Sequence, residues 1–224
     1  PFAGLFGACS TMAEGLALGA ALCEGGAARN LLAMASSHFC AAERQFRTPL
    51  SYGAVRTPTA QWTATAAGCC LLQPQGEGVG IAAATFGRVQ DYQVKDINNM
   101  GAAMAPAAAS TLLHYFKDTG TEPQEFDCIY TGDLGQVGSQ LLRELLAAEG
   151  LLIKNHVDCG CILFDANEQS VKSGGSGPGC CAAVLCGHIL PRLRRGSPER
   201  VLFTATGALM SPPTFLQKAS IPAV

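Results

Sequence analysis

The sequence predicts an α/β fold, and three observations support this prediction. Predicted strands and helices alternate along the chain. Glycines and other small residues gather where the predicted strands end, as they do in sheets whose loops carry a site. The 224 residues include 15 Lys and Arg, 17 Asp and Glu, and only 7% aromatic residues. This length allows a full hydrophobic core, and the near-neutral charge gives no indication of nucleic-acid binding.

A turn of small residues at 4–11 precedes the first predicted helix, which ends at the glycine pair 25–26. The apolar residues of this helix predict one buried face at helical spacing: Met12, Leu16, Leu18, Ala20 and Leu22.

Cys9 lies in the turn directly before this helix. Ser10 or Thr11 can cap the first free backbone N–H groups, and the helix dipole favours a thiolate at Cys9. Many enzymes present a nucleophilic cysteine in this way, so one interpretation is a catalytic thiol. The other is a buried cysteine that packs as a small hydrophobe. The local sequence leaves both interpretations open.

The remaining elements are predicted from apolar periodicity and turn residues. Strands are predicted at 27–35, 61–72, 78–87, 126–130 and 200–205. Helices are predicted at 41–47, 98–116, 139–149 and 180–195, with a proline-containing loop over 48–60. Asparagine caps the helix at 98–116, and Pro106 falls in its early turns, where proline is best tolerated.

The chain contains 11 cysteines, an odd number, and two pairs of them are adjacent in sequence. No C-x-x-C motif is present, so the pattern predicts reduced thiols in a non-oxidising compartment. No apolar run approaches the roughly 20 residues of a membrane span, and no signal peptide is recognised. Because the chain begins at Pro1 in a structured element, we expect that the first part of a longer protein is missing.

The histidines and the glycine loop indicate few further sites. The loop at 173–179 lacks the lysine of a phosphate loop, so it predicts close packing or a pocket wall. His38 ends a predicted buried strand and is a candidate pocket residue. His114 and His188 are expected to be structural, and His156 to be exposed in a turn. No histidine spacing indicates a metal site.

Arg44 and Arg47 share one face of the predicted helix at 41–47. Together they could bind an anion bidentately. A solvated basic helix face is the alternative interpretation.

The turn at 7–10 and the helix after it resemble the nucleophile segment of the thiolase and β-ketoacyl-synthase superfamily. Within that superfamily, the chain is similar to the stage V sporulation protein AD family. The stretches that carry this resemblance are 36–47, 59–63, 94–108, 130–135, 158–160, 173–179 and 204–212. They extend over nearly the whole chain.

The resemblance implies a thiolase-like five-layered αβαβα fold that is N-terminally truncated. Residues 1–88 would be the remainder of the first thiolase-like half, and residues 89–224 the second half.

The resemblance also implies a function. Members of this family are understood to bind dipicolinic acid (pyridine-2,6-dicarboxylate) and to assist its uptake into the developing spore. They work with the other membrane proteins of the stage V sporulation A operon, as peripheral proteins at the spore inner membrane. They are not known as condensing enzymes and are expected to need no cofactor. A homodimer is compatible with the superfamily.

The family comparison places Cys9 at the nucleophile position. A synthase histidine would fall within the stretch 130–133, where this chain has none, and Ser176 takes the place of the second catalytic partner. The acid cysteine of thiolases is also absent near 205–207. Acyl transfer needs a base and oxyanion donors, so this pattern favours a binding module without catalytic residues.

The candidate ligand-binding residues are Cys9, His38, Arg44, Arg47, Asp133 and Ser176. No metal ligand is predicted, although Asp133 could meet calcium if dipicolinic acid binds as its calcium chelate. The alternatives are an acyl-transferring condensing enzyme that uses Cys9 and a scaffold that keeps the fold only for its interfaces.

Overall fold

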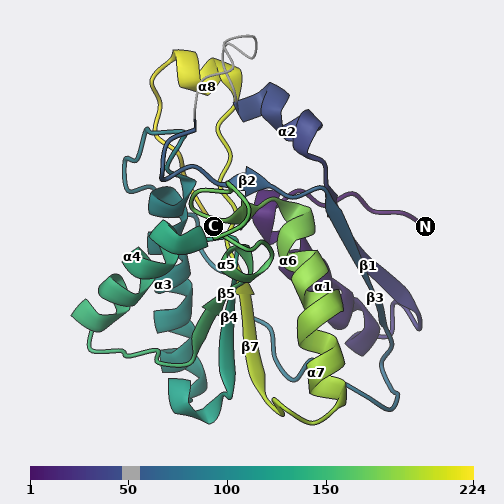
Figure 1. Ribbon diagram of the computed structural model, residues 1–224. Coiled ribbons are helices and arrows are strands. Elements are labelled where there is room, and N and C mark those ends of the chain that lie inside the picture. Colours follow the sequence, from purple (N-terminus) through teal and green to yellow (C-terminus); the bar gives the residue numbers. More distant parts are fainter. Residues whose placement is uncertain (47–55) are drawn as a thin grey trace.

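The computed structural model describes residues 1–46 and 56–224, without the side chains of 43–46 (Figure 1). The strands are β1 (Leu31–Ser37), β2 (Trp62–Thr63), β3 (Ala66–Leu72), β4 (Cys128–Gly132), β5 (His156–Asp158), β6 (Gly175–Ser176) and β7 (Val201–Ala205). The helices are α1 (Thr11–Glu24), α2 (Phe39–Phe46), α3 (Met100–Thr119), α4 (Gly135–Ala148), α5 (Cys159–Ile162), α6 (Pro178–Val184), α7 (Leu190–Arg194) and α8 (Pro212–Leu216). Two 3-10 turns, η1 (Ala8–Ser10) and η3 (Pro123–Glu125), and a π-helical turn, η4 (Leu185–Ile189), complete the elements used below.

Four layers succeed one another across the molecule (Figure 1). Helices α3 and α4 cover one face of the parallel sheet β5-β4-β7. Helices α1 and α6 lie against the other face, and the antiparallel pair β1-β3 forms the next layer. Successive side chains of β4 point to opposite faces of the sheet, and both faces are covered. Ile129 faces the α3–α4 core, and Tyr130 faces the α1–α6 core.

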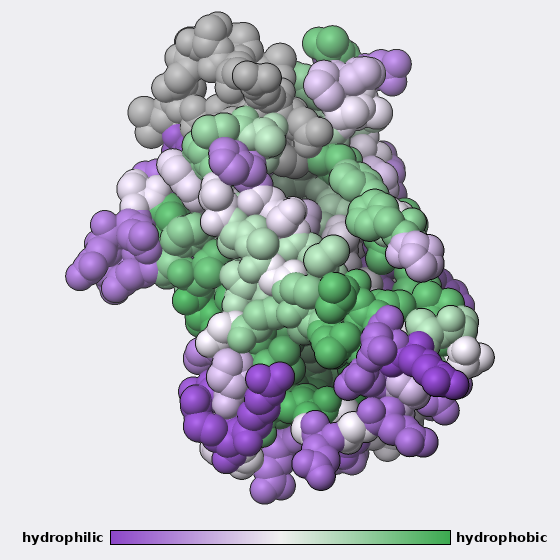
Figure 2. Space-filling model, turned by 90° about the vertical axis from the view of Figure 1, so that its right-hand side faces the viewer, coloured by the Kyte–Doolittle hydropathy of each residue, from purple (hydrophilic) through white to green (hydrophobic). Residues whose placement is uncertain are grey.

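The outer face of β1-β3 is apolar and uncovered in the part of the chain that the structure describes. Leu32, Met34 and Leu71 are 58%, 54% and 58% exposed. Figure 2 shows that hydrophobic residues spread over much of this side of the molecule. The four layers observed here are therefore consistent with four of the five expected from the resemblance.

The buried face of α1 differs from the predicted one. Met12, Gly15, Gly19 and Cys23 are buried, whereas the side chains of Leu18 and Leu22 are exposed. Gly19 packs closely, because a Cβ added there would lie 2.6 Å from Leu72 Cδ1 and 2.8 Å from Leu31 Cδ2, and both side chains would have to shift. The helix approaches β1-β3 through its small residues, so Leu18 and Leu22 turn outward, whereas Leu16 packs against the core as predicted.

Two predicted strands are corrected by the structure. The stretch 78–87 forms no strand; its glycine- and alanine-rich backbone is exposed, and Gly78 has a φ of +131°. The stretch 61–72 divides into β2, which pairs in parallel with β6, and β3, which pairs antiparallel with β1. The helix predicted at 180–195 contains the π-helical turn η4, directly before Pro191, which has no N–H to donate.

The other predicted strands and helices are present, with shifted ends. Asn99 caps α3 by accepting a hydrogen bond from the backbone N–H of Ala102 (3.2 Å). The boundary at residue 88 stays a prediction. Because α6 packs on β1 and β3, the segments before and after that boundary share a core.

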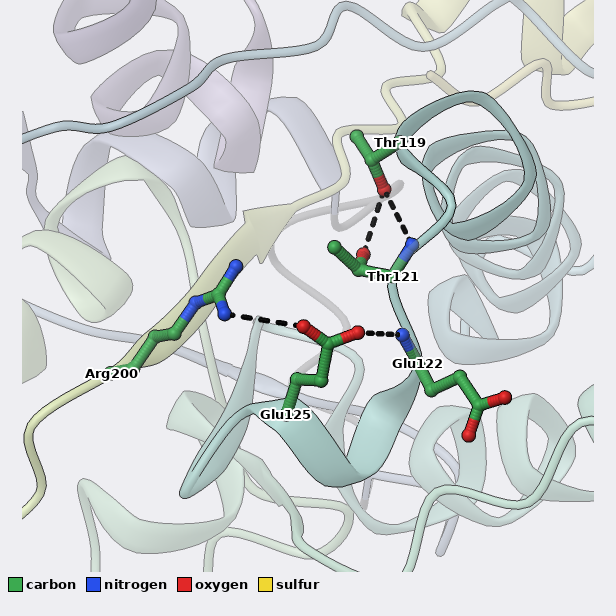
Figure 3. Close-up of polar contacts among 5 residues, drawn as sticks. All are labelled: Thr119, Thr121, Glu122, Glu125 and Arg200. Carbon is green, nitrogen blue, oxygen red and sulfur yellow. Dashed lines mark hydrogen bonds and ion pairs between the residues drawn. The ribbon is translucent and has the colours of Figure 1, made fainter.

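Polar contacts join the loop after α3 to the start of β7 (Figure 3). Arg200 Nη1 lies 3.4 Å from Glu125 Oε2, and the other oxygen of Glu125 accepts from the backbone N–H of Glu122 (2.7 Å). Asp127 Oδ2 accepts from the backbone N–H groups of Glu199 (2.8 Å) and Arg200 (2.9 Å). These contacts fix the loop that leads into β7 beside the start of β4.

Candidate functional site

The turn η1 presents Cys9 at the start of α1, with Ala8 in the left-handed region at a φ of +49°. The hydroxyls of Ser10 and Thr11 do not cap α1 as predicted. Ser10 Oγ donates to the carbonyl of Gly7 (2.6 Å), and Thr11 Oγ1 donates to the carbonyl of Ala8 (2.7 Å). These hydroxyls therefore stabilise the turn that holds Cys9, rather than the helix end.

Ser176 is the polar neighbour of the Cys9 thiol. Cys9 is 8% exposed, and its Sγ lies 3.5 Å from Ser176 Oγ, which is only partly buried. The pairing of β6 with β2 positions Ser176 opposite Thr63. Gln61 Nε2 donates to the carbonyls of Asp133 (2.6 Å) and Gly175 (3.1 Å), so it joins the loop after β4 to β6.

Asp133 is fully buried at the end of β4, with a φ of +66°. Its carboxyl lies beside the thiols of Cys9 and Cys180, and neither oxygen has another hydrogen-bond donor. Burial, together with the nearby charge of Asp158, raises the pKa of Asp133 well above its usual value. The site therefore favours the neutral acid form of Asp133.

Asp158, at the end of β5, is a buried carboxyl with a full set of partners. It accepts from Thr131 Oγ1 (2.7 Å) and from the backbone N–H groups of Leu134 (2.9 Å) and Gly135 (2.9 Å). Burial raises its pKa to about 6 despite these hydrogen bonds, which act in the opposite direction. Asp158 thereby holds the loop that carries Asp133.

His156 extends this buried network. Because Thr131 Oγ1 donates to Asp158, the 2.7 Å contact between Thr131 Oγ1 and His156 Nε2 has the imidazole as donor. Burial lowers the pKa of His156 to about 4, with a further contribution from Arg143. The prediction of an exposed His156 in a turn is therefore wrong, because β5 places its ring against β4.

The Cys9 thiol is not activated. Burial first, and then the adjacent Asp133, raise the pKa of Cys9 to about 12. The expected preference for a thiolate at the start of α1 is wrong, because desolvation outweighs the helix dipole. Cys9 is protonated at neutral pH.

The structure brings together three of the predicted site residues, Cys9, Asp133 and Ser176. His38 lies outside this cluster and is exposed directly after β1. The side chain of Arg44 and the whole of Arg47 lie outside the described residues. None of the histidines contacts the Cys9 thiol, because His114 lies beside the Ser110 carbonyl and His188 beside the ring of Tyr130.

Sequence reasoning missed Gln61, Thr131, His156 and Asp158. Asp158 ends β5 and pairs with Thr131 near the end of β4, and their places near the strand ends are the signal that could have placed them near Asp133. All 11 cysteines are free thiols in the structure. The described residues contain no group of three or more side chains suited to hold a metal ion, and none of the described helices is long and apolar enough to cross a membrane.

The arrangement of these layers is similar to that of condensing enzymes. The structure matches 3-oxoacyl-[acyl-carrier-protein] synthase III from Aquifex aeolicus with a TM-score of 0.54 at 13% identity, over 96% of this chain and 63% of that chain. It matches a variant of OleA from Xanthomonas campestris with a TM-score of 0.56 at 11% identity, over 98% of this chain and 65% of that chain. The protein therefore has the thiolase-like fold, as predicted.

The sequence comparisons identify the family within this fold. The profile of stage V sporulation protein AD matches residues 1–224, and the chain belongs to this family. It is 43% identical over 225 residues to the stage V sporulation protein AD of Bacillus subtilis (strain 168). The match covers 100% of this chain and 66% of that relative, so the chain spans just under two thirds of its length.

Proposed function

We propose that this sporulation protein binds dipicolinic acid at the Cys9 site and assists its uptake into the developing spore. In this proposal it acts at the spore inner membrane with the other membrane proteins of the stage V sporulation A operon. The choice of ligand comes from the family resemblance, and the chemistry of the site supports a binding role over acyl transfer.

The observation that carries the binding role is the state of Cys9. A nucleophilic thiol needs a lowered pKa or an adjacent base. The pKa of Cys9 is instead raised to about 12, its oxygen neighbour is the hydroxyl of Ser176, and no histidine contacts it. The site therefore keeps the geometry of a nucleophile turn without the groups that would activate the thiol.

The neutral form of Asp133 removes an objection to a dianionic ligand. An ionised carboxylate beside Cys9 would repel dipicolinate, but a protonated carboxyl can donate a hydrogen bond to it. Ser176 offers a second hydroxyl donor at the partly exposed side of the thiol. His38, Arg44 and Arg47 remain candidates for the cationic contacts that a second carboxylate needs.

Isothermal titration calorimetry of the full-length protein with dipicolinate tests this proposal. We expect binding that weakens at least tenfold in Ser176→Phe, because the new ring would occupy the open side of Cys9. Ser211→Phe, at an exposed position beside α8, is the matched control and should bind as the parent does. The proposal fails if the parent shows no binding at millimolar dipicolinate or if Ser176→Phe binds equally well.

The role of Asp133 can be separated from a calcium site. If the neutral acid donates to the ligand, Asp133→Asn should bind dipicolinate within about threefold of the parent without calcium, because the amide is also a donor. Asp133→Ala should bind more weakly. Binding that requires calcium and disappears in Asp133→Asn would show instead that Asp133 meets the metal of the calcium chelate.

Acyl transfer through Cys9 is the competing function, since the fold is shared with condensing enzymes. It requires an acyl group on Cys9 after incubation with acyl-CoA. Intact-protein mass spectrometry should show no such adduct, and an adduct that is absent from Cys9→Ser would overturn the binding role.

A further inference from the structure

A cavity of about 680 Å³ lies at the opposite end of β4 from Cys9. It lies between the start of β4 and the continuous segment formed by α6, η4 and α7. Figure 1 shows α7 beside the lower end of the sheet. The Cys9 site lies at the other end, because Asp133, which contacts Cys9, follows the last residue of β4. The volume is within the usual range of small-molecule sites, roughly 300–1,000 Å³.

The inner part of this cavity is apolar and partly aromatic. Tyr130 faces it from β4, Leu163 from the end of α5, and Val184 from α6. The ring of Tyr130 meets that of His188 edge to face, with the ring centroids 6.5 Å apart. Such walls fit a flat ring, which can pack between aliphatic side chains and against aromatic edges.

The two charged side chains that line the cavity, Asp127 and Arg192, differ in whether they have a polar partner. Asp127 accepts from the backbone N–H groups of Glu199 and Arg200, so its carboxylate already has donors. Arg192 of α7 lines the cavity, and no carboxylate of the described residues forms an ion pair with it. Its guanidinium lies close enough to Tyr130 and Cys128 to act on both electrostatically. One cationic group therefore remains available to an anionic ligand.

We propose that this cavity binds an aromatic monocarboxylate, with the carboxylate on Arg192 and the ring between Leu163 and Val184. One guanidinium can hold one carboxylate bidentately, which argues for a single charge on the ligand. The apolar wall accounts for the aromatic body. This site is independent of the proposed dipicolinate site, because it shares no residue with the Cys9 cluster.

Gly187 allows the cavity to be filled without disturbing the fold. It lines the cavity, and a Cβ added to it would have no atom within 4 Å. Gly187→Leu therefore projects a side chain into open space. Gly80→Leu is the matched control, since Gly80 also has open space at its Cβ but does not line the cavity.

Calorimetry of the full-length protein with 2-naphthoate tests the proposal. We expect binding that weakens at least tenfold in Gly187→Leu and in Arg192→Gln, and that stays within twofold in Gly80→Leu and in Arg194→Gln. Arg194 is exposed on the same helix but does not line the cavity. Thermal unfolding of each variant establishes that a loss of binding is not a loss of fold.

Three results would overturn the proposal: no binding of 2-naphthoate at millimolar concentration, equal binding by Gly187→Leu, or equal loss in both arginine variants. Ser176→Phe separates the two sites. It should weaken dipicolinate binding and leave 2-naphthoate binding unchanged. If it abolishes 2-naphthoate binding while Gly187→Leu does not, the probe occupies the Cys9 site and the second site is refuted.

Discussion

The partly buried imidazole of His156 should give the protein a specific sensitivity to acid. Its pKa is about 4 in the folded protein, against an ordinary value of 6.5. Because the unfolded chain binds the proton more readily, lowering the pH from 6.5 towards 4 removes stability from the folded state. The two pKa values differ by about 2.5 units, which corresponds to about 3 kcal/mol of unfolding free energy at about 1.36 kcal/mol per unit.

The substitution His156→Gln tests this reasoning. Glutamine does not titrate, and its amide can still donate to Thr131 Oγ1, which the imidazole now does at 2.7 Å. We expect the free energy of unfolding of the variant to gain about 3 kcal/mol relative to the parent between pH 7.5 and pH 4. The raised pKa of Asp158 acts in the opposite direction, but it is present in both proteins and cancels in this comparison.

Urea unfolding at half-unit pH steps measures the difference. His38→Gln is the control, because His38 is an exposed histidine that lies outside this network. Its curve should run parallel to that of the parent. If the curve of His156→Gln is also parallel within about 0.5 kcal/mol, the imidazole is not buried as the structure has it, and the reasoning is refuted.

Two further predictions concern Cys9 and the packing of β3. With a pKa of about 12, Cys9 should be alkylated by iodoacetamide at pH 8 far more slowly than the exposed Cys40, as peptide mass spectrometry would show; faster labelling of Cys9 would contradict the site. Gly68→Ala should destabilise the protein by about 1–3 kcal/mol, because the new Cβ would lie 2.5 Å from the Ala182 carbonyl oxygen. Gly76→Ala would meet only Gln73 Oε1, at an ordinary 3.9 Å, and should change the unfolding free energy by less than about 0.5 kcal/mol; equal effects in thermal unfolding would disprove the close contact.

The sequence was informative wherever a local pattern decides the structure. The apolar runs at 126–130 and 200–205 predicted β4 and β7, and the capping asparagine predicted the start of α3. Family resemblance predicted the thiolase-like fold, and the comparisons confirm it. The stretch 78–87 was predicted wrongly because an alanine-rich run has no decisive periodicity.

The candidate site was only partly predictable for a physical reason. Cys9 was identified from its place at a helix start, and Asp133 from the family resemblance. Their protonation, however, depends on desolvation by groups distant in sequence, and no local pattern reports this. His156 was misplaced for the same reason, since its burial arises from the pairing of β5 with β4.

The sequence by itself determined the α/β class, the family and the turn that presents Cys9. Short-range periodicity and turn chemistry specify the class and the turn, whereas the family follows from the resemblance of longer sequence stretches. Only the tertiary structure decided that the turn holds a protonated thiol beside Ser176 and a buried Asp133 with a raised pKa. Burial sets the charge of each group, and burial is a property of the packed layers rather than of any single stretch.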